Sequence, residues 1–115
     1  MVKQWQIYFI NFNPVLGSEQ AGTRPCIVVS ANCTNHLNQV TVLPITSMKA
    51  SYTTIYPNEV FLPQSISKLP KDSIILAHQI RAVDKQRLIN YVGTITDIEY
   101  ITQIQEAIKF QLDLE

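Results

Sequence analysis

Charged side chains are scarce in this chain, at 16% of its 115 residues, against about 25% in a typical globular domain. Nine basic and nine acidic residues cancel to a formal net charge of zero. A protein that coats duplex nucleic acid shows a basic face and a high pI. The composition therefore excludes that class and limits any nucleic-acid contact to a small local patch. The low charge also indicates a surface that is either polar but neutral or partly covered by a partner, and the second alternative points to an oligomer.

Residues for metal and cofactor chemistry are equally few. His36, His78, Cys26 and Cys33 form neither an HExxH motif nor a CxxC pair, so no metal site is predicted. Three glycines cannot build a P-loop or a dinucleotide fingerprint, and no cofactor is expected. We interpret His36 as an exposed turn residue and His78 as a hydrogen-bonded histidine within a strand. The cysteines are interpreted as buried structural thiols, although the sequence also allows one disulfide between them.

Long apolar runs are absent as well. None reaches the ~18 residues needed to span a bilayer. Strand-like alternation begins already at Trp5, which argues against a signal peptide. We therefore expect a reduced, cytoplasmic, single domain over residues 1–115 with no membrane partner.

What the chain does contain is a series of short apolar segments followed by one helix. Residues 4–12 alternate with apolar side chains on both faces, which predicts a strand buried on both sides or lying at an interface. Further strands are predicted at 25–30, 40–45, 58–62, 73–80 and 90–95. Residues 83–88 are typical of one helical turn with Asp84 as its N-cap.

The C-terminal segment 96–114 carries the strongest helix signal. Thr96 and Glu99 have the spacing of a capping box. A stripe of branched apolar residues follows at three- and four-residue spacing and predicts packing on a sheet: Ile101, Ile104, Ile108 and Leu112. The fold class is therefore mainly β (α+β), a small barrel of five to seven strands with a C-terminal helix.

The loop at residues 17–25 is the part of the chain with most chemistry. It carries Glu19, Gln20 and Arg24 between two apolar runs. Because Pro25 forces the preceding backbone to be extended, the Arg24 guanidinium has a defined direction and suits an anionic ligand. The alternative is a solvated loop arginine before a proline that starts a strand.

A second group of polar residues, Thr46 and Ser47, ends the strand predicted at 40–45. If this strand and the one at 25–30 pair as a hairpin, Arg24 and Thr46 become neighbours at one rim. They would form a compact anion site with hydroxyl and carboxylate groups close by. The alternative for Thr46 is an ordinary β-branched strand residue.

Three motifs in order give the chain a family resemblance. They are GSEQAGTRPCIVV at 17–29, PITS at 44–47, and a third in two parts, DSIIL at 72–76 and QIRAVDKQRL at 79–88. The set resembles the MazF/PemK family of toxin endoribonucleases. The resemblance implies an SH3-like barrel that forms a homodimer. It also implies metal-independent, sequence-selective cleavage of single-stranded mRNA by the RNA's own 2′-hydroxyl, leaving 2′,3′-cyclic phosphate and 5′-hydroxyl ends.

The resemblance also assigns roles to residues. Arg24 and Thr46 match the family's catalytic pair, and Glu19 is a candidate base. Substrate-binding roles fall to Gln20, Ser47, Gln79 and Arg81, with Gln79 a candidate for reading a base edge. The chain departs from the family where Trp5-Gln6 replaces a glycine followed by an acidic residue, and at His78.

The implied partner is an antitoxin whose disordered segment folds onto the toxin. One alternative is a CcdB-like toxin with the same fold that binds gyrase without being an enzyme. The Arg24–Thr46 pair, and the lack of an aromatic residue at 111–115, favour the nuclease. A second alternative is an inactive member that only binds a partner.

Overall fold

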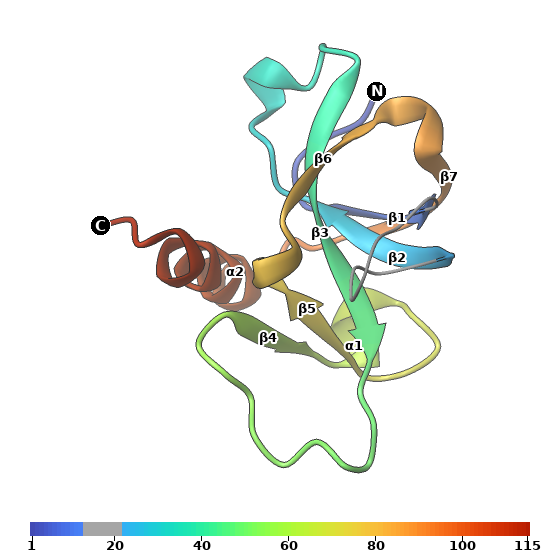
Figure 1. Ribbon diagram of the computed structural model, residues 1–115. Coiled ribbons are helices and arrows are strands. Elements are labelled where there is room, and N and C mark those ends of the chain that lie inside the picture. Colours follow the sequence, from blue (N-terminus) through green and yellow to red (C-terminus); the bar gives the residue numbers. More distant parts are fainter. Residues whose placement is uncertain (13–21) are drawn as a thin grey trace.

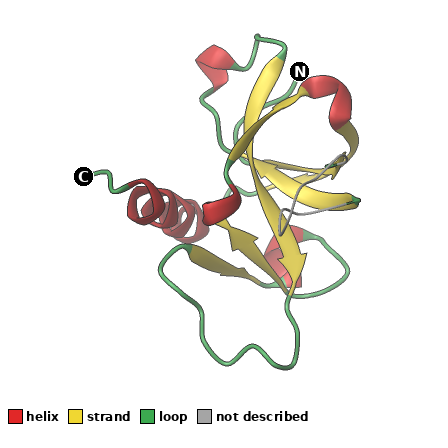
Figure 2. Cartoon of the chain, in the orientation of Figure 1, coloured by secondary structure: helices red, strands yellow, loops and turns green. Residues whose placement is uncertain are grey.

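The computed structural model describes residues 1–12 and 22–115, which form an antiparallel, seven-stranded sheet with a C-terminal helix against it (Figure 1). The predicted fold class, a mainly β (α+β) barrel-like fold with a C-terminal helix, is confirmed, although the sheet is not closed. The strands are β1 (Gln6–Asn11), β2 (Thr23–Val28), β3 (Gln39–Ser47), β4 (Glu59–Leu62), β5 (Ser73–Leu76), β6 (Arg81–Asp84) and β7 (Leu88–Thr94). The helices are α1 (Gln64–Ser67) and α2 (Ile98–Leu112), with 3₁₀ turns at Asn32–Thr34, Ala77–Gln79 and Lys85–Arg87 (Figure 2).

The long strand β3 organises the sheet because it changes partners along its length. Its first part pairs with β6, its middle with β2, and its last three residues with β5. The resulting strand order is β4-β5-β3-β2-β1-β7, with β6 beside the first half of β3. In Figure 1, β3 runs through the middle of the molecule and ends at the long connection to β4.

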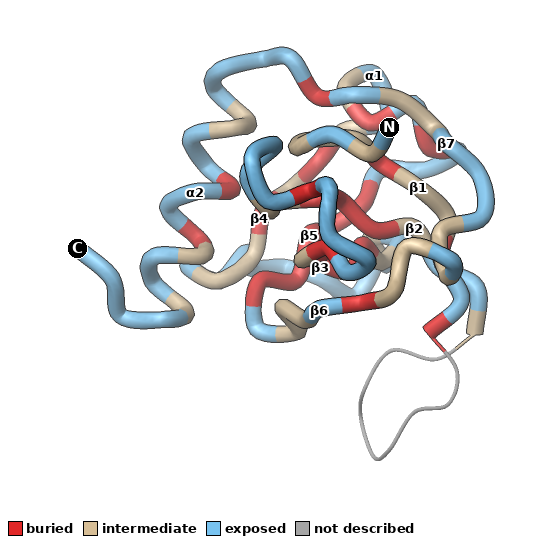
Figure 3. Tube along the Cα trace, turned by 90° about the horizontal axis from the view of Figure 1, so that it is seen from above, coloured by how far each residue is buried: buried red, intermediate tan, exposed pale blue. Residues whose placement is uncertain are grey.

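Strand alternation divides the core into two apolar clusters, one on each face of the strands β1 to β3. Ile7, Ile27 and Leu43 belong to the first cluster, against which α2 packs through Ile104 and Ala107. The second cluster is Ile10, Phe12, Cys26, Val28, Val40, Val42 and Val83. The prediction that the first strand is apolar on both faces is therefore confirmed. Figure 3 shows the buried segments gathered along the strands, with most of α2 exposed.

Two histidine and cysteine predictions need correction. The strand predicted at 73–80 ends at Leu76, and His78 lies exposed in the 3₁₀ turn that follows it. The strand interpretation of His78 is wrong because the chain must turn there to bring β6 back onto β3. Cys26 is a buried free thiol, but Cys33 is an exposed one, so no disulfide joins them. His36 is exposed, as predicted.

The C-terminal helix begins one residue later than its capping box predicts. The N-cap is Asp97, whose carboxylate accepts a hydrogen bond of 2.9 Å from the Glu99 backbone N–H. The bond satisfies a backbone N–H of the first helical turn that has no partner within the helix. Asp97 therefore takes the N-cap position that was predicted for Thr96. The predicted stripe holds for Ile101, Ile104 and Ile108, which belong to the first cluster or pack against it, but Leu112 is 47% exposed and Ala107 is buried instead. The other predicted cap is confirmed: Asp84 accepts from the Gln86 N–H at 2.8 Å.

Membrane insertion through a helix finds no support in the described residues. Their helices are too short or too polar to cross a bilayer.

Candidate active site

The start of β2 and the end of β3 meet at one rim of the sheet. These strands pair antiparallel, with Cys26 opposite Pro44, as the hairpin interpretation requires. Continuing this register by two residues places Arg24 opposite Thr46. Because side chains alternate along a strand, Arg24 and Thr46 lie on the same face as Cys26 and Pro44. Arg24 is exposed and Thr46 is half-buried, so both can reach a ligand at the rim.

The backbone beneath this pair is held on both sides. Arg24 lies opposite Ile10 of β1, and Thr46 lies opposite Ile74 of β5. Both apolar partners are almost completely buried. The two polar side chains therefore project from strands anchored in the core, which suits a site that must hold its geometry.

Arg81, the first residue of β6, lies on the same face beside the first half of β3. It pairs with Val42, so alternation directs its side chain to the face of the second cluster. Its guanidinium carbon lies 5.4 Å from the centroid of the buried Phe12 ring, within cation–π range. Thr46 follows Val42 by four residues along β3, a distance of roughly 13 Å. The same face thus carries two arginines, Arg24 near the end of β3 and Arg81 beside its first half.

The other candidates are placed less closely together. Ser47 is exposed at the end of β3 and lines a cavity of about 230 Å³ with Phe9, Pro25 and Leu69. By alternation this cavity lies on the opposite face of the rim from Thr46. Gln79 is half-buried at the end of the 3₁₀ turn between β5 and β6. Glu19 and Gln20 lie outside the described residues.

The departure at Trp5-Gln6 has a local structural explanation. Trp5 has a φ of 72°, in the left-handed region that glycine adopts freely. Its backbone N–H donates to the Val28 carbonyl at 2.7 Å, and its carbonyl accepts from Ile95 at 3.0 Å. The Gln6 side chain accepts from the Lys3 N–H at 2.7 Å and from the Tyr8 hydroxyl at 2.9 Å. In this chain both positions therefore tie the N-terminal segment to the sheet.

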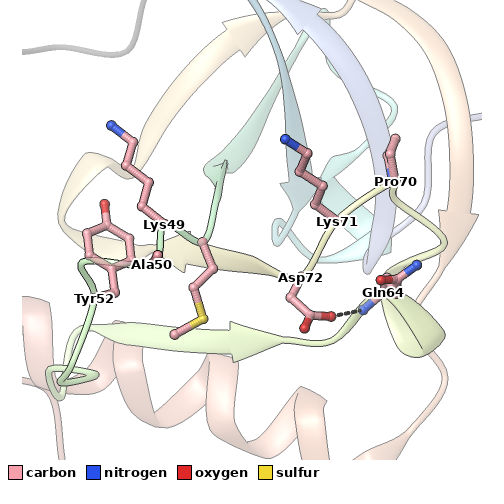
Figure 4. A pocket seen from close by; sticks show the side chains of 8 residues that line it. Lys49, Ala50, Tyr52, Gln64, Pro70, Lys71 and Asp72 are labelled. Carbon is pink, nitrogen blue, oxygen red and sulfur yellow. Dashed lines mark hydrogen bonds between the residues drawn. The ribbon is translucent and has the colours of Figure 1, made fainter.

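A polar pocket that the sequence did not reveal lies just beyond the end of β3. It has a volume of about 490 Å³, and Lys49, Tyr52, Gln64 and Lys71 are among the residues that line it (Figure 4). Lys49 and Tyr52 come from the connection between β3 and β4. Lys71, however, comes from a different connection, and only the pairing of β3 with β5 brings it close.

The site can bind and orient an anion. Its guanidinium and hydroxyl groups suit a phosphate, on which they can stabilise developing negative charge. Within residues 1–12 and 22–115, no group of three or more histidine, cysteine, aspartate or glutamate residues could hold a metal ion. Burial raises the pKa of the Cys26 thiol to about 12, so this thiol stays protonated and chemically inert.

Comparisons with known proteins agree along nearly the whole chain. A family model described as "PemK-like, MazF-like toxin of type II toxin-antitoxin system" matches residues 3–112. Endoribonuclease EndoA of Bacillus subtilis is 32% identical over 114 residues, covering 99% of this chain and 97% of that protein. Endoribonuclease MazF9 of Mycobacterium tuberculosis is 35% identical over 120 residues, covering 99% and 98%. A solved mycobacterial endoribonuclease in complex with its cognate antitoxin has the same fold, with a TM-score of 0.80 and 22% identity, covering 100% of this chain and 98% of that one.

Proposed function

This chain belongs to the PemK-like, MazF-like toxins of type II toxin–antitoxin systems, and we propose that it is an endoribonuclease that cleaves single-stranded mRNA at selected sequences without a metal ion. The relatives named above are endoribonucleases at 32% and 35% identity over almost their full length. The observation that carries the proposal is the antiparallel pairing of β2 with β3, which brings Pro25 and Ser47, the chain neighbours of Arg24 and Thr46, into one cavity at the rim.

The proposed reaction uses the nucleophile of the RNA itself. The 2′-oxygen attacks the neighbouring phosphorus and the bond from phosphorus to the 5′-oxygen breaks. The leaving 5′-oxygen takes up a proton from water, so a 2′,3′-cyclic phosphate and a 5′-hydroxyl result. Arg24 stabilises the negative charge that develops on the phosphate oxygens, and the Thr46 hydroxyl donates to one of them and orients it. Glu19 is the proposed base that takes the proton of the 2′-hydroxyl.

Substrate binding is proposed for the polar residues around this pair. Arg81 is on the same face as Thr46, so its guanidinium suits a second phosphate of the strand. Ser47 lies at the end of β3 and Gln79 in the 3₁₀ turn between β5 and β6, and Gln79 suits the edge of an unstacked base. Gln20 completes the set from the loop before Arg24.

Two protein partners are part of the proposal. The first is a cognate antitoxin with a disordered segment that folds onto the toxin and covers the RNA site. A solved structural neighbour is in complex with its cognate antitoxin, which supports this partner. The second is another copy of this chain, forming a homodimer that covers part of a surface with few charges.

The test uses purified protein, a long unstructured RNA and excess EDTA. New 5′-hydroxyl ends are mapped by labelling with polynucleotide kinase without prior phosphatase treatment. Arg24→Ala is expected to lower the cleavage rate ~10²–10³-fold, the usual cost of losing a donor to a developing oxyanion. Lys109→Ala removes one positive charge from α2 and serves as the matched control, which should cleave like the wild type.

The outcomes separate the proposal from its rivals. Recurrent 5′-hydroxyl ends at one short sequence, lost in Arg24→Ala, would support a metal-independent, selective nuclease. No cleavage of several RNAs by freshly prepared wild type would overturn it. Gyrase binding and antitoxin binding by the same preparation would then distinguish a CcdB-like toxin from an inactive, partner-binding member.

A further inference from the structure

A cationic pocket with an aromatic wall lies next to the proposed catalytic rim. Lys49 and Lys71 line it together with Tyr52, whose side chain is 38% exposed. Figure 4 shows that both ammonium groups and the Tyr52 hydroxyl point to the same side, away from Asp72. Among the described residues neither lysine pairs with a carboxylate, since the ion pair found there joins Lys109 to Glu106. The two positive charges are therefore available to an anionic ligand.

Backbone hydrogen bonds hold these three residues in place. The Met48 N–H donates to the Asp72 carbonyl at 2.9 Å, which joins the segment of Lys49 to that of Lys71. The Tyr52 N–H donates to the Lys49 carbonyl at 2.9 Å and forms a turn that sets the ring beside the lysines. The Asp72 carboxylate is occupied, because it accepts from the Gln64 N–H at 2.9 Å. The local acidic group is thus turned away from the ligand side of the pocket.

The pocket adjoins the rim that carries Arg24 and Thr46, from the face opposite their side chains. Pro70 and Lys71 line both this pocket and the smaller cavity of about 230 Å³ described above. That smaller cavity reaches Pro25 and Ser47, the chain neighbours of Arg24 and Thr46. Lys49 follows Thr46 by three residues, a span of at most ~11 Å. An RNA strand that passes over the end of β3 from one face to the other would therefore reach the pocket with a nearby nucleotide.

We propose that Lys49, Tyr52 and Lys71 form a subsite for a nucleotide next to the scissile phosphate of a single-stranded RNA, an inference that rests on the proposed function. The Tyr52 ring stacks on the base, and the two ammonium groups contact the backbone phosphates. Single-strand binding sites combine these elements, an aromatic platform and a cationic track. Stacking tolerates any base, so the subsite increases affinity for the strand and leaves sequence reading to other residues.

An acidic peptide is the competing ligand for two lysines. It would use the positive charges, but it has no flat π-face to stack on an exposed tyrosine beside Lys49 (Figure 4). The combination of Tyr52 with Lys49 and Lys71 favours a nucleotide. The two ligands predict different results when the ring and the charges are changed separately.

The binding test uses a probe that cannot be cleaved, a short, fluorescein-labelled RNA pool of random sequence with every 2′-hydroxyl methylated. Fluorescence anisotropy gives the dissociation constant for the wild type, Tyr52→Leu and Lys49→Ala/Lys71→Ala. Tyr52→Leu is expected to weaken binding roughly 5- to 150-fold, the usual range for losing one stacked base. The logarithm of the association constant falls as the logarithm of the salt concentration rises. Losing both lysines should make this dependence less steep by about 1.4.

Matched controls come from the same chain. Tyr56→Leu changes an aromatic residue of the same loop that lines a different pocket beside Phe110, and Lys109→Ala removes a charge on α2. Both should bind the probe like the wild type. Thermal unfolding of every variant shows whether a loss of binding reflects a loss of folding.

Each outcome separates this subsite from the nuclease proposal. Selective loss of probe binding in the Tyr52 and lysine variants supports the subsite, even if the wild type fails to cleave RNA, which would overturn the nuclease alone. Variants that bind as tightly as the wild type, or a wild type that does not bind the probe, overturn the subsite. Variants that lose affinity only for the acidic segment of an antitoxin would assign the pocket to that partner and overturn the proposal.

Discussion

The guanidinium group of Arg81 lies over the ring of Phe12, with 5.4 Å between the guanidinium carbon and the ring centroid. Phe12 is fully buried and is the last described residue before the loop that leads to Arg24. Its backbone N–H donates to the Gly22 carbonyl at 3.0 Å, which closes the base of that loop. The contact therefore connects β6 to the point where the loop leaves the sheet.

This contact predicts an energetic coupling between the two residues. In a double-mutant cycle with Phe12→Leu and Arg81→Met, we expect a coupling of about 0.5–2 kcal/mol, because each single change removes the same cation–π contact. Urea denaturation of the four proteins measures it. Strictly additive changes in the free energy of unfolding would mean that the contact contributes nothing to stability.

Thr46 provides a direct test of hydroxyl chemistry against strand packing. Thr46→Val preserves shape and β-branching but removes the hydroxyl, so cleavage should fall ~10²–10³-fold while the fold is retained. Thr46→Ser keeps the hydroxyl and should retain most of the activity. Cleavage rates in EDTA measure both. If Thr46 were only a strand residue, the order would be reversed, with valine tolerated and serine the weaker variant.

Trp5 predicts an unusual order of substitutions because of its positive φ. Replacing its partly buried side chain by alanine loses packing and keeps the backbone strain, whereas glycine loses the same packing but relieves the strain. We expect Trp5→Gly to be more stable than Trp5→Ala by about 1 kcal/mol in urea denaturation. If Trp5→Ala were the more stable variant, as alanine usually is at positions with negative φ, residue 5 would not keep the left-handed conformation.

The two cysteines should differ in reactivity and in their response to pH. A thiol reagent should modify exposed Cys33 rapidly in the native protein and Cys26 only after unfolding. Burial raises the pKa of Cys26 from its ordinary 9.0 to about 12. Between these two pH values the Cys26 thiol keeps its proton in the folded state and loses it in the unfolded state. The contribution of Cys26 to stability is therefore complete below pH ~9 and is lost as the pH rises toward ~12.

Urea denaturation at pH ~8 and ~11 measures this effect, with Cys26→Ala as the control. The wild type should lose more stability than the control over the same interval, because other groups titrate equally in both proteins. Equal losses would contradict the raised pKa of Cys26.

Local patterns in the sequence were enough for much of the fold. Alternation predicted that residues 4–12 are apolar on both faces, and each face indeed joins one of the two clusters. Proline after Arg24 and the polar end of β3 predicted that Arg24 and Thr46 meet at one rim, given the hairpin pairing. These features depend on the pleat of a strand and on the geometry of neighbouring pairs, both of which are encoded within a few residues.

Tertiary structure alone decided the rest. The sequence does not reveal that β3 exchanges β6 for β5, yet this exchange brings Lys71 beside Lys49 and ends the fifth strand before His78. It also decided that Asp97 and not Thr96 caps α2, since both residues have suitable side chains and the packing of the helix selects one starting point. Pairings between distant strands depend on how the whole core closes, so no local pattern contains them.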